Sequence, residues 1–335
     1  MSTTTPNQSS PSSGFRWSSL RDFVLVPPIL LILLIGHLTT DNFLTWGILK
    51  IPIEQATQIG ILVLAQAMVI IIGRMDLSLE STFGLAPAIA VWAVAGIGFA
   101  PNVSGAFLPD FLALPVVLLV GAAVGLINAV MIVKFRLNGF IVTLGMLTAL
   151  RGLQTFLTGG ASLYQLPKSI AGLAHFSFLG MSLSFWVCVS LAVVLILFMQ
   201  FTRHGRALYA VGGNAPAAKA AGIQSEKVIM GVLIAASLMA ALAGVLYTSQ
   251  YASVGQSQGS GYIFTVFAAC VIGGISLNGG RGSIFGAVTG ILLLKFIDQL
   301  LRSLQVSGTV IEFITGTFIL FALIISRIAS GKPQD

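Results

Sequence analysis

Residues 228–247 read VIMGVLIAASLMAALAGVLY, a run without a single charged side chain. About 20 apolar residues are enough for a helix to cross the roughly 30 Å hydrocarbon core of a bilayer. This stretch therefore predicts a membrane-spanning helix. The same criterion of length and apolar composition can be applied to the rest of the chain.

The composition outside that run is of the same kind. The chain has 335 residues, of which 56% are hydrophobic and only 8% charged, whereas soluble domains have roughly a quarter charged residues. The formal net charge is +7, and the cations lie singly or in pairs between the apolar runs. This distribution is typical of charges that orient a membrane protein and does not favour nucleic-acid binding. Cys188 and Cys270 both lie inside apolar runs, so neither a disulfide framework nor a metal site is predicted.

Further apolar runs flank the first on both sides. Backbone groups in lipid must be paired within the segment, so each run predicts a helix, and the fold class is an all-α polytopic membrane protein. Ten candidate spans result: 23–40, 55–73, 82–100, 111–133, 139–157, 182–201, 228–247, 263–277, 284–301 and 309–326.

The distribution of cations predicts the orientation of these spans, because cytoplasmic loops carry the excess of Lys and Arg. With the N-terminus inside, the external segments hold only Lys50, Lys168 and Arg302. The internal segments hold Arg16, Arg21, Arg74, Lys134, Arg136, Arg203, Arg206, Lys219, Lys227, Arg281, Arg327 and Lys332. We therefore expect both termini in the cytoplasm, with a disordered tail at 1–20, a transmembrane domain at 21–328 and a short tail at 329–335.

Small residues at helical spacing predict where helices pack closely. Gly121 and Gly125 form one such pair, and Gly282, Gly286 and Gly290 form a longer series. Packing within one subunit is favoured over a dimer seam.

The longest internal loop, 202–227, contains the signature of a short helix at about 215–221. Asn214 is the expected N-cap, Pro216 stands in the first turn and Gly222 is the expected stop. By composition this helix is either a surface linker or a docking element, and composition does not separate the two.

A few polar residues interrupt the apolar runs. The segment 73–81, GRMDLSLES, predicts either a broken helix that places Asp76 and Ser78 on a translocation path, or a cytoplasmic turn with Asp76 as a helix cap. Arg151 lies within a span, where a structural pair or gate is favoured over direct contact with a solute. Lys295 and Asp298 are expected to form a local pair.

The outer segments 159–181 and 248–262 are rich in Gly, Ser and Gln. They are either plain connections or an entry surface. Tyr251, Gln256, Gln258 and Tyr262 are residue types that suit sugar contact, and Tyr262 completes the candidate path or gate with Asp76, Ser78 and Arg151.

Four stretches together resemble the permease subunits of the ribose-type bacterial ABC sugar importers. Residues 209–223, with Gly212-Gly213-Asn214, Ala217, Ala218 and Gly222, resemble that family's "A-x-GGN-x-x-A-A-x-x-x-GI" loop. Residues 271–283 resemble "VIGGTSLxGGRGS". Residues 140–152, with Arg151-Gly152, resemble "FIxTLGMxxxxRG", and residues 73–78 resemble "GGIDLS".

This resemblance implies a type II-like ABC importer permease in the bacterial cytoplasmic (inner) membrane. Its partners would be a separate ABC ATPase, a periplasmic sugar-binding protein and a second permease copy, identical or not. The chain has no GxxxxGK[ST] loop, so ATP and Mg²⁺ are expected on the ATPase and no catalytic residue or cofactor on this chain. The 212–222 segment (Gly212, Gly213, Asn214, Ala217, Ala218, Gly222) would be the element that couples to the ATPase.

The chain departs from the family pattern at four positions. Arg74 and Glu80 stand where the family has glycine, and these two side chains are candidates to pair with Asp76 or with each other. The family's "GYELDAIAA" appears here as GYIFTVFAA, with Ile263 and Thr265 in place of both acids. If those two carboxylates gate the pathway or contact the substrate in the family, their loss predicts a modified pathway here.

Two competing functions remain at the level of sequence. An ion-coupled secondary transporter commonly uses acidic residues near the middle of the membrane, and only the 73–81 segment and Asp298 qualify. An intramembrane enzyme would need clustered catalytic groups, whereas His37, His175 and His204 are dispersed. The sequence thus favours the permease of an ATP-driven importer for a monosaccharide or related small polar solute.

Overall fold

The structure is a computed structural model that describes residues 24–95 and 107–330. The predicted tail 1–20 and residues 331–335 lie outside the described residues, so the domain boundaries stay predictions. The elements in chain order are α1 (Val26–Thr39), α2 (Trp46–Ile71), α3 (Leu79–Ala95), η3 (Asp110–Leu112), α4 (Ala113–Ala129), η4 (Val130–Lys134), α5 (Gly139–Thr158), α6 (Lys168–Ala171), η5 (Gly172–His175), β1 (Ser177–Phe178), β2 (Met181–Ser182), α7 (Leu183–Phe201), α8 (Arg203–Gly213), α9 (Ala215–Ala220), α10 (Ser225–Tyr251), α11 (Tyr262–Ile272), α12 (Ile284–Ser303) and α13 (Gly308–Ser330).

Each of the ten predicted runs contains a helix, namely α1, α2, α3, α4, α5, α7, α10, α11, α12 and α13. Among the described residues, six helical segments are long and apolar enough to cross a membrane: 46–71, 110–134, 139–158, 183–201, 225–251 and 284–303. The chain is therefore an all-α, multi-pass membrane protein. The count of ten crossings and the side of each terminus stay predictions.

Two sequence predictions of helix extent need correction. The run 263–277 is helical only to Ile272, because Gly273 and Gly274 end α11 and Gly274 adopts a left-handed φ of 81°. Residues 203–213, expected to be loop, form α8, whose first turn is capped by the hydroxyl of Thr202. A search for apolar runs could not find this helix, because it is rich in Arg and Gly.

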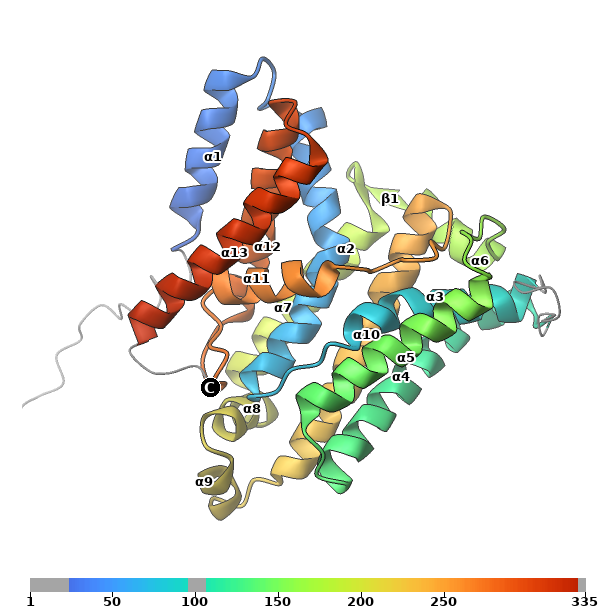
Figure 1. Cartoon of the computed structure of the whole chain (residues 1–335), viewed down its shortest axis with the longest axis vertical. Coiled ribbons are helices and arrows are strands. Elements are labelled where there is room, and N and C mark those ends of the chain that lie inside the picture. Colours follow the sequence, from blue (N-terminus) through green and yellow to red (C-terminus); the bar gives the residue numbers. More distant parts are fainter. Residues whose placement is uncertain (1–23, 96–106, 331–335) are drawn as a thin grey trace, which may run out of the picture.

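Helix α2 forms the centre of the molecule. Its residues 56–71 are all buried, and it packs against α10, α12, α7 and α11. Figure 1 shows α3 and α11 running across the direction of α2 and α13, with α8 and α9 at the lower end of the view and the α1–α2 connection at the upper end. The molecule thus has two distinct ends, with the loop that contains α9 at one of them.

Glycines allow the closest approaches between helices. A Cβ on Gly286 would lie 2.1 Å from the Gly273 carbonyl oxygen, and one on Gly290 would lie 2.2 Å from that of Ala269. Gly282, at a left-handed φ of 134°, packs against Ile275. The three glycines of the predicted packing series therefore hold α12 against α11 and the following turn of the same chain. Gly121 and Gly125 do the same for α4 against α10.

Candidate functional site

The described part of the chain contains a cavity of about 930 Å³ between α2, α10, α11, α12 and α13. Its lining combines amides, phenols and charges with apolar side chains. The lining residues are Gln55, Gln58, Ile59, Tyr247, Tyr251, Ser260, Gly261, Tyr262, Phe264, Thr265, Leu294, Lys295, Asp298, Arg302, Gly308, Ile311, Glu312, Thr315, Gly316 and Leu320. A volume of this size lies within the usual range of small-molecule sites.

Three tyrosines form one wall of this cavity. The Tyr262 hydroxyl lies 3.3 Å from that of Tyr247, and the Tyr247 and Tyr251 ring centroids are 4.3 Å apart. Phe83 of α3 supports them from behind, with its ring centroid 5.7 Å from that of Tyr262 in an edge-to-face arrangement. Phenol groups of this kind offer both an apolar ring face and a hydrogen-bonding hydroxyl.

Charged side chains from α12 and α13 also line the cavity. Asp298 Oδ1 lies 3.2 Å from Arg302 Nε, one helical turn away. Among the described residues, the direct ion pair of Asp298 is with Arg302, whereas Lys295, its predicted partner, interacts with the same carboxylate electrostatically without a direct ion pair. Lys295 and Glu312 complete the charged lining. The cavity can thus bind a polar solute through both donors and acceptors.

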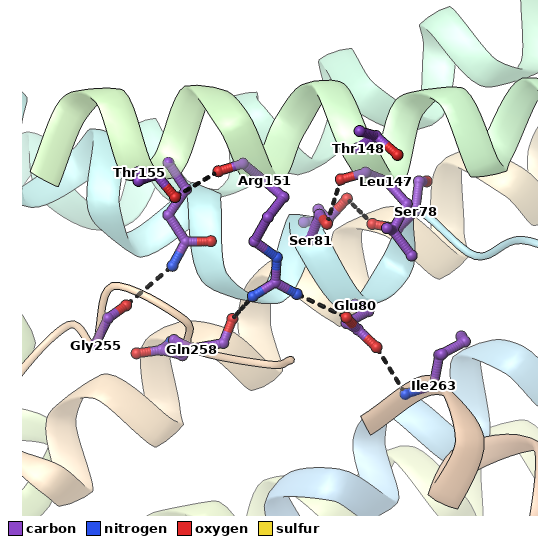
Figure 2. A network of polar contacts seen from close by, with 12 residues as sticks. Ser78, Glu80, Ser81, Leu147, Thr148, Arg151, Thr155, Gly255, Gln258 and Ile263 are labelled. Carbon is purple, nitrogen blue, oxygen red and sulfur yellow. Dashed lines mark hydrogen bonds and ion pairs between the residues drawn. The ribbon is translucent and has the colours of Figure 1, made fainter. Parts of the chain in front are cut away.

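A partly buried ion pair joins α5 and α3 and is drawn in Figure 2. Arg151 Nη2 is 2.7 Å from Glu80 Oε1, and their side chains are 20% and 6% exposed. Arg151 Nη1 also donates to the backbone carbonyl of Gln258 at 3.3 Å. The sequence favoured a structural pair or a gate for Arg151; the structure supplies a partner, 71 residues away in the chain, and a gate role stays a prediction.

Gln258 is one of the residues suggested for sugar contact, but it is buried and makes structural bonds. Its Nε2 group donates to the carbonyls of Phe83 and Gly244, both at 3.2 Å, and lies 3.1 Å from Thr248 Oγ1. This amide therefore joins α3, α10 and the loop before α11. Of the four residues suggested for sugar contact, Tyr251 and Tyr262 line the cavity.

Asp76 and Ser78 lie in a second buried cluster, in the connection between α2 and α3. Asp76 Oδ1 accepts hydrogen bonds from the Ser78 backbone NH at 2.9 Å and the Ser78 hydroxyl at 2.6 Å. Asn128 of α4 donates to Ser78 Oγ at 2.7 Å. The helix break predicted at 73–81 is present, but neither Asp76 nor Ser78 is among the cavity-lining residues. Their part in a path or gate stays a prediction.

The ion pairs suggested for the two non-family charges are not found. Within the described residues, no ion pair joins Arg74 to Asp76 or to Glu80. Asp76 is bonded by Ser78 and Asn128, while Glu80 turns toward Arg151.

The residues of the predicted coupling segment divide into an inner and an outer set. Gly212 belongs to α8 and packs inside the chain, since a Cβ there would lie 1.8 Å from the Ile71 carbonyl oxygen. Ala218 is also buried. Gly213, Asn214, Ala217 and Gly222 are exposed.

The predicted helix at 215–221 is present as α9, one residue shorter. The Asn214 side chain caps it by accepting from the Ala217 NH at 2.9 Å, as predicted. Gly222 has the left-handed φ of 82° expected of a helix stop. Ala218 packs α9 against the rest of the chain, while the face of α9 that carries Ala217 is exposed.

Sequence reasoning did not identify Gln55, Gln58 or Glu312 as cavity residues. The two glutamines are three apart on α2, so they share a helix face and interrupt an otherwise apolar run. That pair was a usable signal, whereas the position of Glu312 opposite α12 depends on the tertiary packing.

Six apolar helices in the described part of the chain, each long enough to cross a membrane, define it as a multi-pass membrane protein, and the comparison with known families gives its class, a transport protein. A family model described as "branched-chain amino acid transport system / permease component" matches residues 51–325. The chain belongs to this family, in the branch of ribose-type ABC importer permeases, and it is a transport subunit, not an enzyme.

Two relatives illustrate this similarity. The chain is 31% identical to the ribose import permease protein RbsC of Haemophilus influenzae over 292 residues, covering 86% of each chain. It is 33% identical to the autoinducer 2 import system permease protein LsrC of Yersinia enterocolitica over 264 residues, covering 79% of this chain and 71% of the relative. No solved structure matches the chain.

Proposed function

We propose that this chain is the transmembrane subunit of an ABC importer that moves a monosaccharide or a sugar-like small polar solute across the bacterial inner membrane. The cavity that combines three tyrosines with amide and charged side chains carries this proposal, because hydroxyl-rich solutes need both ring faces and hydrogen-bonding groups. The names of the relatives, which refer to ribose and autoinducer 2, support the same class of solute.

The topology predicted from the cations agrees with a cavity that opens outward. The lining residues come from the start of α2, the end of α10, the start of α11, the second half of α12 and the first half of α13. All of these are the outer halves of their helices in that topology. A periplasmic binding protein would deliver the solute there, and a second permease copy would complete the membrane part.

The exposed face of α9 is the proposed contact for the separate ATPase. Rigid-body movement of the ATPase would be transmitted through α9, which is anchored by Ala218, and through α8, whose Gly212 lies against the end of α2. This connects the coupling loop directly to the helix at the centre of the fold.

The test of this function uses Ala217→Arg, which places a long charged side chain on the exposed face of α9. We expect normal membrane insertion but loss of solute-stimulated ATPase activity and of uptake in vesicles containing the permease and its ATPase. The control, Gln200→Arg, adds the same charge at an exposed site at the end of α7 and should leave both activities unchanged. Normal uptake without any associated ATPase would contradict the proposal.

The solute itself is best identified on the partner. Thermal shift of the purified binding protein with a panel of pentoses, hexoses and polyols should show a stabilised complex for one group of these compounds.

A further inference from the structure

Helices α3 and α11 begin close to each other, and one carboxylate lies between their first turns. Figure 2 shows Glu80 at the start of α3 with its side chain directed toward Ile263 at the start of α11. Glu80 Oε2 accepts a hydrogen bond from the Ile263 backbone NH at 3.0 Å, while Oε1 binds Arg151. Both carboxylate oxygens are thus used, and by different elements.

The first turn of α11 has no side-chain cap from its own N-cap residue. That residue is Gly261, at a left-handed φ of 82°. The first NH groups of a helix need an acceptor, and the positive end of the helix dipole favours an anion there. Glu80 meets this need from a distance of 183 residues in the chain.

We propose that Glu80 is a positioning residue that holds the first turn of α11, and with it Tyr262, at the wall of the cavity. It does so as one clamp with Arg151, supplying from α3 the carboxylate that the family pattern carries at position 263. This inference rests on the proposed function, because it assigns the clamp to the solute cavity.

The clamp is connected to Tyr262 on two sides. Along the chain, Tyr262 precedes the residue whose NH is held by Glu80. Across the fold, Phe83 lies one helical turn after Glu80 and contacts the Tyr262 ring. Displacement of the carboxylate therefore changes both the backbone and the ring environment of this tyrosine.

The exchange between positions 80 and 263 follows from the same geometry. The carboxylate of Glu80 lies within hydrogen-bond distance of the backbone of residue 263. An acidic side chain built on that residue begins beside the same point and can reach the Arg151 guanidinium. In the family pattern, with glycine at position 80 and an acid at 263, the carboxylate beside Arg151 would come from α11. In this chain it comes from Glu80 of α3, so both arrangements place one carboxylate at the same point.

The experiment measures uptake in vesicles containing the complete transporter for Glu80→Gly, Ile263→Glu and the double variant. We expect Glu80→Gly to lower uptake by about tenfold or more, and the double variant to recover most of it. The matched control is Glu54→Gln, a change at a half-buried carboxylate that is bonded by Ser182 and lies outside the cavity lining. It should leave uptake within about twofold of wild type.

A second measurement does not depend on transport. Tyr262→Cys is introduced into each variant, and its rate of reaction with a water-soluble maleimide is measured; the native Cys188 and Cys270 are buried. We expect Glu80→Gly to change this labelling rate, and the double variant with Ile263→Glu to return it to the value measured with Glu80 present. If Glu80→Gly does not reach the membrane, Glu80→Gln takes its place.

Two results would overturn the clamp. One is unchanged uptake and labelling when the carboxylate at position 80 is removed. The other is a double variant that is present in the membrane at the wild-type level but restores neither quantity. If the wild-type protein shows no ATP-dependent uptake, the proposed function fails, while the labelling rates still decide the clamp.

Discussion

The segment 73–81 carries two buried carboxylates, and the contacts of Asp76 differ from those of Glu80. Asp76 is held by the NH and hydroxyl of Ser78, two residues away, and by Asn128. Within the described residues it forms no ion pair, whereas Glu80 pairs with Arg151 and accepts from Ile263. One carboxylate shapes a local turn, and the other joins α3, α5 and α11.

This difference shows where a buried charge affects function. The two hydrogen bonds from Ser78 hold Asp76 Oδ1 locally, and Asn128 of α4 adds only a long contact of 3.5 Å to Oδ2. Glu80 keeps its partners only while three helices hold their arrangement, so its contacts respond to any movement of α5 or α11. The Glu80 end of the segment is therefore the better candidate for a part of the transport cycle.

The largest effect is expected from breaking the Glu80–Arg151 pair on one side. Arg151→Met leaves the Glu80 carboxylate buried without its cation, which costs up to about 3–5 kcal/mol. The free energy of unfolding, measured by SDS titration of the purified protein, should fall by an amount in this range. Adding Glu80→Gln to Arg151→Met should recover part of the loss, because no uncompensated charge then remains.

A double variant that is as unstable as the sum of its two single changes would contradict this interpretation. It would mean that the two side chains act independently, and the contrast with Asp76 would then lose its basis.

A smaller effect is expected at Asp76. Asp76→Asn removes the charge but keeps an oxygen that can accept from the Ser78 NH and hydroxyl, so the cost should be about 1 kcal/mol. Asp76→Ala removes the acceptor and leaves buried donors without a partner, which costs about 1–3 kcal/mol. The same SDS titration ranks both variants, and a loss in Asp76→Asn as large as in Arg151→Met would show that the Asp76 charge itself is essential.

The same contrast explains how much the sequence could predict. Apolar runs located the ten helices, and spacing along the chain located the Asn214 cap and the break at 73–81. The partner of Arg151 was beyond reach, because 71 residues separate it from Glu80 and charge spacing carries information only within a helix or turn. Spacing also did not decide the direct partner of Asp298, because Lys295 at i−3 and Arg302 at i+4 lie on the same face of α12 and both interact with its carboxylate.

The cavity was predictable only in part, for a related reason. Tyr251 and Tyr262 were suggested by residue type, but Gln258, equally suitable by type, is occupied by the carbonyls of Phe83 and Gly244. Whether a polar side chain is free for a solute depends on the backbone groups packed around it. Only the folded chain shows these groups.

The smallest effect is expected at an exposed pair of the same kind. Lys134 Nζ lies 3.9 Å from Glu226 Oε2, and both side chains are 61% exposed. Water and salt screen such a pair, so Glu226→Gln should change the free energy of unfolding by less than about 1 kcal/mol.

Raising the ionic strength from about 0.1 M to about 1 M shortens the Debye length from about 10 Å to about 3 Å. This should remove the small difference between Glu226→Gln and wild type, whereas the loss caused by Arg151→Met should persist because the Glu80 carboxylate is buried. An Arg151→Met effect that disappears in salt would place Glu80 in contact with water and equate the two pairs.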